Sequence, residues 1–201
     1  MKKIILLLAI MMASTTTISA QEEQPRHEIG VSYGWGMSFF EDVFGYQILT
    51  AVFNSMSGYS WENGSYSGTI GAEYFYHLNN PKLAVGGIVT YAHFGEDYIQ
   101  NSTGNKGGES SRTYMSFMPG IKYNWVNKKS FGLYSKAAVG LMLVTVSDKN
   151  YVSGKDDSSS ACHITWQASL LGMEFGKKVR VFTELGLGEQ GIFLAGLKYR
   201  F

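Results

Sequence analysis

The chain ends in the segment Gly191–Phe201, GIFLAGLKYRF, in which bulky apolar residues alternate with small or charged ones. Side chains of a β-strand point to opposite faces in turn, so this alternation predicts a final strand with two unlike faces. One face carries Phe193, Ala195, Leu197, Tyr199 and Phe201. The other carries Ile192, Leu194, Gly196, Lys198 and Arg200. Because soluble domains rarely finish on an apolar strand, the start of the chain is the next place to look.

The first 20 residues have the three parts of a secretory signal peptide. Lys2 and Lys3 form a charged beginning, Ile4 to Met12 is apolar, and Ile18-Ser19-Ala20 supplies small residues before a cleavage site. The apolar run is too short to span a membrane as a helix. We therefore expect cleavage after Ala20, with an uncleaved anchor as the alternative, and assign residues 21–201 to one domain.

The composition of the remaining chain excludes several classes of protein. All 16 acidic residues and all but two of the 17 basic residues lie there, so its net charge is about −1 and gives no reason to expect nucleic acid as a partner. No run of 18 apolar residues remains, which excludes a helical membrane protein. Cys162 is the single cysteine, so stability must come from burial and backbone pairing rather than from an intramolecular disulfide.

Eight segments show the two-residue alternation of strands. In the first, the residues on one face are bulky and apolar and those on the other are small or polar, which suits a narrow barrel with lipid outside. The sixth is the least regular, because Leu171, Met173 and Phe175 would face inward. The segments are His27–Phe39, Tyr66–Leu78, Lys82–Phe94, Arg112–Trp125, Phe131–Val146, Ala161–Phe175, Val179–Gly188 and Ile192–Phe201.

The connections between these segments alternate in length. Residues 79–81, 126–130 and 176–178 are short turns, whereas residues 40–65, 95–111 and 147–160 are long, and only Glu189-Gln190 is short on that side. Short turns at one end and long outer loops at the other are typical of outer-membrane barrels. The first long loop has apolar spacings that suit a short amphipathic helix, and Asn63-Gly64 within it predicts a tight turn. An extra hairpin there would make ten strands instead of eight.

The sequence therefore predicts an all-β fold, an eight-stranded antiparallel up-and-down transmembrane β-barrel. In hydrocarbon only a closed sheet pairs every backbone group without leaving an edge. Aromatic residues near the strand ends fit the two interfacial girdles of such a barrel. A secreted soluble β-sandwich or lipocalin-like barrel is the alternative. The expected girdle residues are Trp35, Tyr74, Tyr76, Tyr91, Tyr123, Trp125 and Trp166.

From Glu28 to Phe201 the chain resembles the small eight-stranded outer-membrane barrel proteins of Gram-negative bacteria, of the OmpX and OmpA-transmembrane type. The most specific piece is the final strand, with Leu197, Tyr199 and the carboxy-terminal Phe201 at alternate positions. The resemblance implies that this strand is a sorting signal read by the barrel-assembly machinery. It also implies a location in the outer membrane, with lipid and lipopolysaccharide as neighbours. Fold analogy alone does not supply an activity.

Charged residues fall on the inward face of several strands. Glu73, Lys122, Lys136 and Glu184 should lie at a similar depth, and opposite charges buried there are expected to pair. A second set of charges should lie at the periplasmic rim, and it comprises Glu28, Arg180, Lys198 and Arg200. Two interpretations stay open, a structural plug of ion pairs and a narrow gated pore.

Three functions follow as hypotheses. The first is a non-enzymatic outer-membrane protein that supports envelope integrity or binds an unidentified surface ligand through its outer loops. The second is a narrow channel for ions or small apolar solutes. The third is an enzyme that modifies lipid A, for which His163-Ile164-Thr165 departs from the deacylase motif and His93 with Asp97 is a thin candidate. The sequence predicts no metal site and no cofactor, because the histidines lack ligand spacing.

Overall fold

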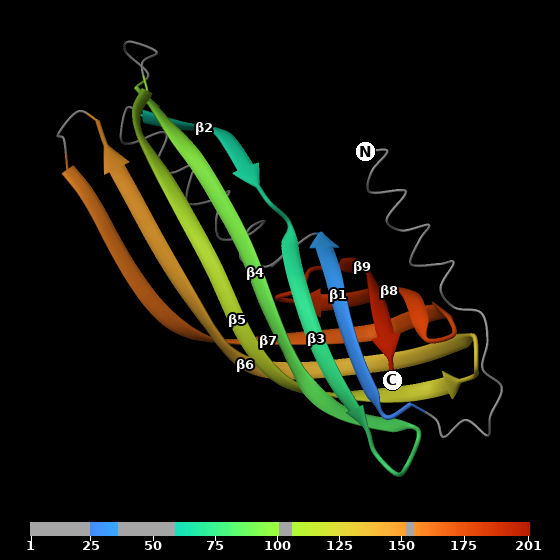
Figure 1. The fold of residues 1–201 in the computed structure, drawn as a ribbon. Coiled ribbons are helices and arrows are strands. Elements are labelled where there is room, and N and C mark those ends of the chain that lie inside the picture. The colour runs from blue at the N-terminus through green and yellow to red at the C-terminus, as the bar shows by residue number, and fades with distance from the viewer. Residues whose placement is uncertain (1–24, 36–58, 101–105, 152–154) are drawn as a thin grey trace.

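The computed structural model describes residues 25–35, 59–100, 106–151 and 155–201 (Figure 1). The expected signal peptide and the amphipathic part of the first outer loop lie outside these residues. Nine strands form the described part of the chain, and none of its segments is a helix long and apolar enough to cross a membrane. The strands are β1 (His27–Trp35), β2 (Tyr59–Tyr66), β3 (Thr69–His77), β4 (Leu83–Gln100), β5 (Lys106–Asn127), β6 (Phe131–Asn150), β7 (Lys155–Gly176), β8 (Val179–Gly188) and β9 (Phe193–Arg200).

Eight of the nine strands close into a ring. From β3 to β9 each strand pairs antiparallel with the next, and β1 pairs with both β3 and β9. The amides and carbonyls of His27 and Phe201 exchange two hydrogen bonds, of 3.0 and 2.9 Å, at the seam. The predicted eight-stranded antiparallel barrel is confirmed. The ninth strand, β2, pairs with β4 outside the ring, so the ten-stranded alternative is wrong.

The two faces of the barrel are inverted relative to a soluble protein. Most of its outward side chains are apolar and many are well exposed, among them Val85 at 40 % and Ile164 at 79 %. Its interior holds buried Glu, Lys, Arg, Gln, Ser and Thr side chains beside a small apolar cluster. A closed sheet pairs its own backbone, so this sequence places apolar side chains where a lipid phase would cover them.

A bulge in β7 corrects the prediction for the sixth segment. Between Ser169 and Leu171 the pairing with β8 shifts by one residue, leaving Leu170 as the extra residue. Leu170 and Leu171 are consequently both exposed, and Phe175 is also exposed while Glu174 is fully buried. The expectation that Leu171, Met173 and Phe175 face inward is wrong, because a bulge reverses the alternation after it.

The side chain of Ser135 on β6 stabilises this bulge. Its hydroxyl donates to the Leu170 carbonyl at 2.6 Å, and it accepts a hydrogen bond of 2.9 Å from the Trp125 indole. The Leu170 carbonyl, which the bulge leaves out of the strand pairing, thus keeps a hydrogen-bond partner. On the apolar side of the barrel no water would be available to replace it.

Much of two predicted outer loops is strand. β4 continues to Gln100 and β5 begins at Lys106, while β6 continues to Asn150 and β7 begins at Lys155. The expected loops at 95–111 and 147–160 are therefore largely paired backbone. Beyond the apolar belt, polar residues occupy both faces of these strands, so hydrophobic periodicity does not reveal them. We call this part the extended sheet: residues 59–66, 93–100, 106–113, 145–150 and 155–160.

The extended sheet rises on one side of the barrel only. β4 to β7 are 18–22 residues long, whereas β1, β8 and β9 have 8–10. Figure 1 shows the four long strands leaning well past the ends of the short ones, with β2 added along β4. Asn63-Gly64 lies inside β2 at a register shift, so the tight turn predicted there is wrong.

β2 and β3 are joined by a sharp kink at Ser67-Gly68. Gly68 has a positive φ of 73°, a conformation that costs other residues free energy. The Tyr33 ring covers it, since a Cβ on Gly68 would lie 2.2 Å from the Tyr33 hydroxyl oxygen. That hydroxyl donates to the Ser67 carbonyl at 3.1 Å. The kink lets one stretch of chain supply both a ring strand and a strand of the extended sheet.

Candidate functional site

The amino group of Lys198 lies at the centre of the charged barrel interior. Its Nζ is 3.1 Å from a Glu73 oxygen and 3.5 Å from a Glu28 oxygen, and 3.9 Å from Glu174 and from Glu184. It also lies 4.1 Å from the centroid of the Tyr134 ring. Strand β9 thereby places one cation beside four carboxylates. These carboxylates belong to β1, β3, β7 and β8.

Two further lysines complete the middle of this network. Lys136 Nζ is 2.7 Å from Glu73 and 2.9 Å from Glu184. Lys122 Nζ is 2.7 Å from Glu28 and 3.3 Å from Glu174. Each amino group thus touches two carboxylates, which compensates part of the large cost of removing both charges from water.

Tyr134 links the pairs through its hydroxyl. It accepts a hydrogen bond of 2.7 Å from Lys198 and donates one of 2.6 Å to Glu184. Lys122 Nζ also lies 4.0 Å from the centroid of its ring, an attractive position for a cation. The ring fills the space between the two lysines.

The arginines join the same network from the end of the barrel that carries the short turns after β3, β5 and β7. Arg200 Nε donates to Glu28 at 2.6 Å and its Nη2 donates to Glu174. Arg180 pairs with Glu174 at 2.9 Å and donates to the carbonyls of Lys128 and Lys129. His77 Nε2 lies 3.3 Å from Glu28. The second layer of rim charges that the sequence suggested is continuous with the first.

We name these side chains the interior network: Glu28, Glu73, Lys122, Lys136, Glu174, Arg180, Glu184, Lys198 and Arg200. None is more than 4 % exposed. Eight of them were expected from the sequence. Glu174 was missed because the β7 bulge hides its inward position. The roles of Tyr134 and His77 were missed because their contacts come from strands that are distant in the sequence.

Above the interior network, the turn between β8 and β9 fills the lumen. The backbone amide of Gln190 donates to the Gln167 side chain at 2.8 Å, and Thr165 donates to Glu189 at 3.2 Å. All four side chains are buried. The interior of the described barrel is thus occupied by the interior network below and by these four side chains above it, as a ring of eight strands has room for little else.

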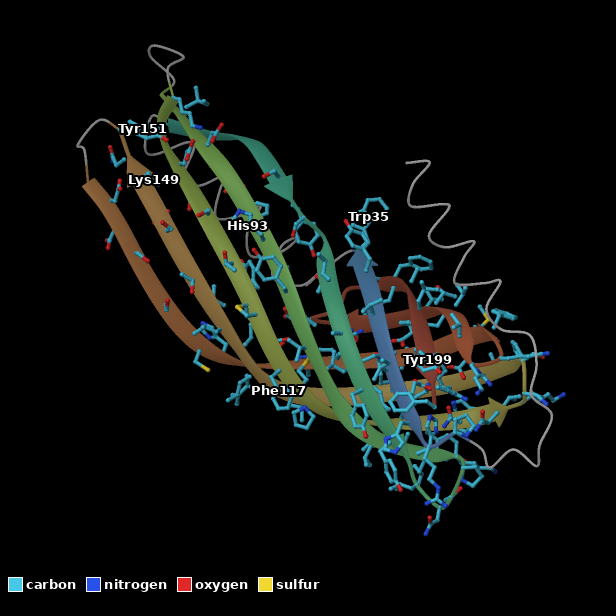
Figure 2. All side chains as sticks on the ribbon, viewed as in Figure 1. Trp35, His93, Phe117, Lys149, Tyr151 and Tyr199 are labelled. Carbon is cyan, nitrogen blue, oxygen red and sulfur yellow. The ribbon has the colours of Figure 1, made fainter. Side chains whose placement is uncertain are left out.

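The expected girdle residues lie on the outside of the barrel. Trp35 is 72 % and Trp125 62 % exposed, and Figure 2 shows Trp35 at the outer end of β1. Tyr74, Tyr91 and Trp166 are exposed, and Tyr76 and Tyr123 are partly exposed. At the opposite end the His27 ring stacks on Phe201 with centroids 5.3 Å apart and meets the Tyr76 ring at 5.2 Å. Aromatic side chains thus mark both ends of the apolar belt.

The segment expected to act as an assembly signal forms the closing strand. Leu197, Tyr199 and Phe201 face outward, and Leu197 is half-buried while the other two are exposed. Tyr199 and Phe201 stack with ring centroids 5.7 Å apart. Recognition of this strand by the assembly machinery stays a prediction from the resemblance.

The residues considered for lipid A chemistry do not come together. Thr165 is buried against Glu189, and His163 is exposed two residues away on β7. His93 Nδ1 lies 3.2 Å from Thr113 Oγ1, and Asp97 pairs instead with Lys106 at 2.9 Å. Neither histidine therefore adjoins the nucleophile or acid proposed for it.

Near the top of the extended sheet a small group of charges joins β4 to β5. Lys106 lies 2.9 Å from Asp97 and 2.5 Å from Glu109. Hydrogen bonds to Glu109 and Asp97 raise the pKa of Lys106 above its usual value, and the hydrogen bond from Lys106 lowers the pKa of Glu109. The pair stays ionised at neutral pH, but its exposure limits its effect on stability.

Among known proteins, similar chains are found in solved structures. A scan against protein-family models finds no match, and a search of curated proteins also finds none. Two solved structures of Ail, the attachment invasion locus protein of Yersinia pestis, are similar at 14 % identity. One covers 89 % of this chain and 100 % of its own with a TM-score of 0.48. The other, in complex with the heparin analogue sucrose octasulfate, covers 88 % and 99 % with a TM-score of 0.46.

The chain is thus a closed eight-stranded barrel with an apolar exterior and a charged interior. The fold expected from the resemblance to small outer-membrane barrels is confirmed by the strand pairing itself.

Proposed function

We propose that this protein is a non-enzymatic barrel of the bacterial outer membrane that holds the extended sheet outside the cell for contact with a surface partner. The observation that carries the proposal is the inversion of the barrel, with exposed Val, Ile, Leu, Phe and Trp outside and the interior network inside. A soluble protein rarely exposes so continuous an apolar surface. A membrane would cover this apolar surface, because strands of about nine residues are long enough to cross its hydrocarbon core.

The orientation follows from the strand lengths. The expected signal peptide sends the chain to the periplasm, where the assembly machinery would insert it. Barrels of this class keep short turns inside and long connections outside. The turns after β3, β5 and β7 would then face the periplasm, and the extended sheet would face the exterior.

One edge of the extended sheet supports the proposed contact with a partner. Over residues 155–165, β7 pairs only with β6 among the described strands, since its pairing with β8 begins at Gln167. An unpaired edge presents backbone donors and acceptors that another extended chain can join. Side chains such as Ser158 and Ser160 make this edge polar, which suits a surface exposed to water.

Labelling of single cysteines on intact cells tests this orientation. In a Cys162→Ser background, Ser158→Cys is expected to react with a membrane-impermeant maleimide, because Ser158 is exposed on the extended sheet. Lys177→Cys, in the turn between β7 and β8, is the matched control and should react only after the outer membrane is permeabilised. Equal labelling of both positions, or the reverse pattern, would contradict the proposal.

The filled interior argues against the channel hypothesis. A conducting path would have to pass the buried side chains of the interior network and the turn at Glu189–Gln190. In planar bilayers the refolded mature protein is therefore expected to show no discrete conductance steps. The measurement is single-channel recording, with Lys136→Met and Glu184→Gln as variants. Steps in the wild-type protein that change in these variants would favour a channel.

A further inference from the structure

The two ends of the barrel carry opposite charges. The extended sheet contains seven acidic and four basic residues, which leaves it a net charge of −3. The short turns lie at the opposite end, as Figure 1 shows for the turns after β3 and β5. Among the described residues of that end, all the exposed charged side chains are basic. They are Arg26, Lys82, Lys128, Lys129, Lys177 and Lys178.

The acidic side chains near this basic end point into the barrel. Glu28 and Glu174 are fully buried, and both pair with Lys122 and Arg200 in the interior network. Apart from the terminal carboxylate of Phe201, the described residues of this end present no exposed anionic group. The exposed lysines are therefore placed to attract an anion from outside the chain.

Four of these lysines lie on two neighbouring turns that the buried Arg180 ties together. Its guanidinium donates to the carbonyls of Lys128 and Lys129 at 3.0 and 3.1 Å, and its Nε donates to the Lys177 carbonyl at 3.1 Å. The backbone of both turns is thereby held in place beneath the exposed side chains. We name these two segments the lysine turns: residues 128–130 and 177–178.

An aromatic pair lies on the outward face beside the lysine turns. Phe131 begins β6 directly after one turn and Phe175 lies near the end of β7 before the other, with ring centroids 5.1 Å apart. Phe175 is 52 % exposed, and Trp125 on the neighbouring β5 is 62 % exposed. A lipid whose acyl chains cover these rings would bring its headgroup to the level of the lysines, as interfacial aromatic and basic residues do in other membrane proteins.

We propose that the lysine turns bind the phosphate groups of anionic phospholipids in the leaflet that faces the short turns. This inference rests on the membrane location in the proposed function and names a lipid partner for the end of the barrel away from the extended sheet. Ammonium groups attract phosphate, and a headgroup without an amine of its own leaves that charge uncompensated. The bound lipids would fix the depth of the barrel at this end.

Quenching of a single tryptophan by brominated lipids tests this site. The refolded mature chain keeps Trp125, beside the lysine turns, while Trp35, Trp61 and Trp166 are replaced by phenylalanine. Phosphatidylcholine vesicles contain the same fraction of either brominated phosphatidylglycerol or brominated phosphatidylcholine, and the ratio of quenching gives the relative affinity. We expect phosphatidylglycerol to be preferred about fivefold. A chain that keeps only Trp35, at the other end of the barrel, is the matched control and should show no preference.

Two double variants of equal charge locate the effect on the Trp125 chain. Lys128→Gln with Lys177→Gln takes one charge from each lysine turn and should at least halve the preference. Lys106→Gln with Lys149→Gln removes the same charge from the extended sheet and should leave the preference unchanged. Mobility on an unheated gel first establishes that each chain forms a closed barrel.

Two outcomes would overturn the proposal. One is equal quenching by the two lipids at Trp125. The other is a preference that the two double variants lower equally, or that neither lowers, because it would then not come from the lysine turns. The labelling experiment keeps the two proposals apart. Expected labelling with equal quenching rejects only the phospholipid site, and reversed labelling with a retained preference rejects only the orientation.

Discussion

Replacing Lys198 with methionine should lower the free energy of unfolding by about 3–5 kcal/mol, because it leaves buried carboxylates without their shared cation. Lys198 is fully buried and lies within 3.9 Å of four glutamates. Methionine keeps much of the volume but removes the Nζ that lies 4.0 Å from the centroid of the Phe182 ring, so the loss reports mainly on charge. The measurement is urea unfolding of the refolded barrel in detergent, followed by tryptophan fluorescence.

A double-mutant cycle separates pairing from packing. Glu73→Gln alone should also destabilise, and the combination with Lys198→Met should cost clearly less than the sum of the two, because the residues lie 3.1 Å apart. Lys149→Met, on the exposed end of β6, is the control and should change stability by less than about 0.5 kcal/mol. Additive effects in the cycle would show that Lys198 and Glu73 do not interact as the distances indicate.

Replacing Gly86 with alanine is the second change expected to have a large effect. A Cβ at this inward position would lie 1.9 Å from the Tyr74 carbonyl oxygen and 2.8 Å from the Phe75 Cα. Both atoms belong to the backbone of β3, so relief requires the two paired strands to separate. We expect a loss of about 3 kcal/mol or more, or failure to refold, measured by the same urea titration.

The neighbouring Gly87 provides a control of the same chemistry on the other face. A Cβ there would meet the Phe117 ring edge at 3.3 Å, an exposed side chain that can move. Gly87→Ala should therefore refold with nearly wild-type stability. Similar losses in both variants would mean that strand flexibility, rather than the close approach of β3 and β4, accounts for the effect of Gly86→Ala.

The sequence predicts the barrel well where lipid would constrain it. Outward positions such as Ile29, Val31 and Val181 must be apolar, so alternation reveals their strands and faces. In the extended sheet that constraint ends. Ser158, Ser159 and Ser160 occupy both faces of β7 with one residue type, so nothing in the pattern distinguishes this strand from a loop.

The interior network could be predicted only in part. Alternation is sufficient to place Glu73 and Lys136 inside, but their pairing depends on which strands face each other across the lumen. The central position of Lys198 arises from the closure of β9 on β1, which the local sequence does not encode. The inward position of Glu174 depends on the bulge at Leu170. Nothing in the sequence distinguishes Leu170 and Leu171 from leucines in a regular strand. The pairing of these charged side chains is therefore set by strands that are distant in the sequence, and alternation within one strand does not reveal it.

The uneven height of the barrel wall gives the molecule a direction within the plane of a membrane. Over β8, β9 and β1 the described wall ends close to the apolar belt, whereas over β4 to β7 it continues far beyond it (Figure 1). In a membrane, the extended sheet would stand between the apolar belt of β4 to β7 and the exterior parts of any large neighbour that approaches from that side. The tall wall would therefore limit how closely a neighbour with large exterior domains can pack against β4 to β7.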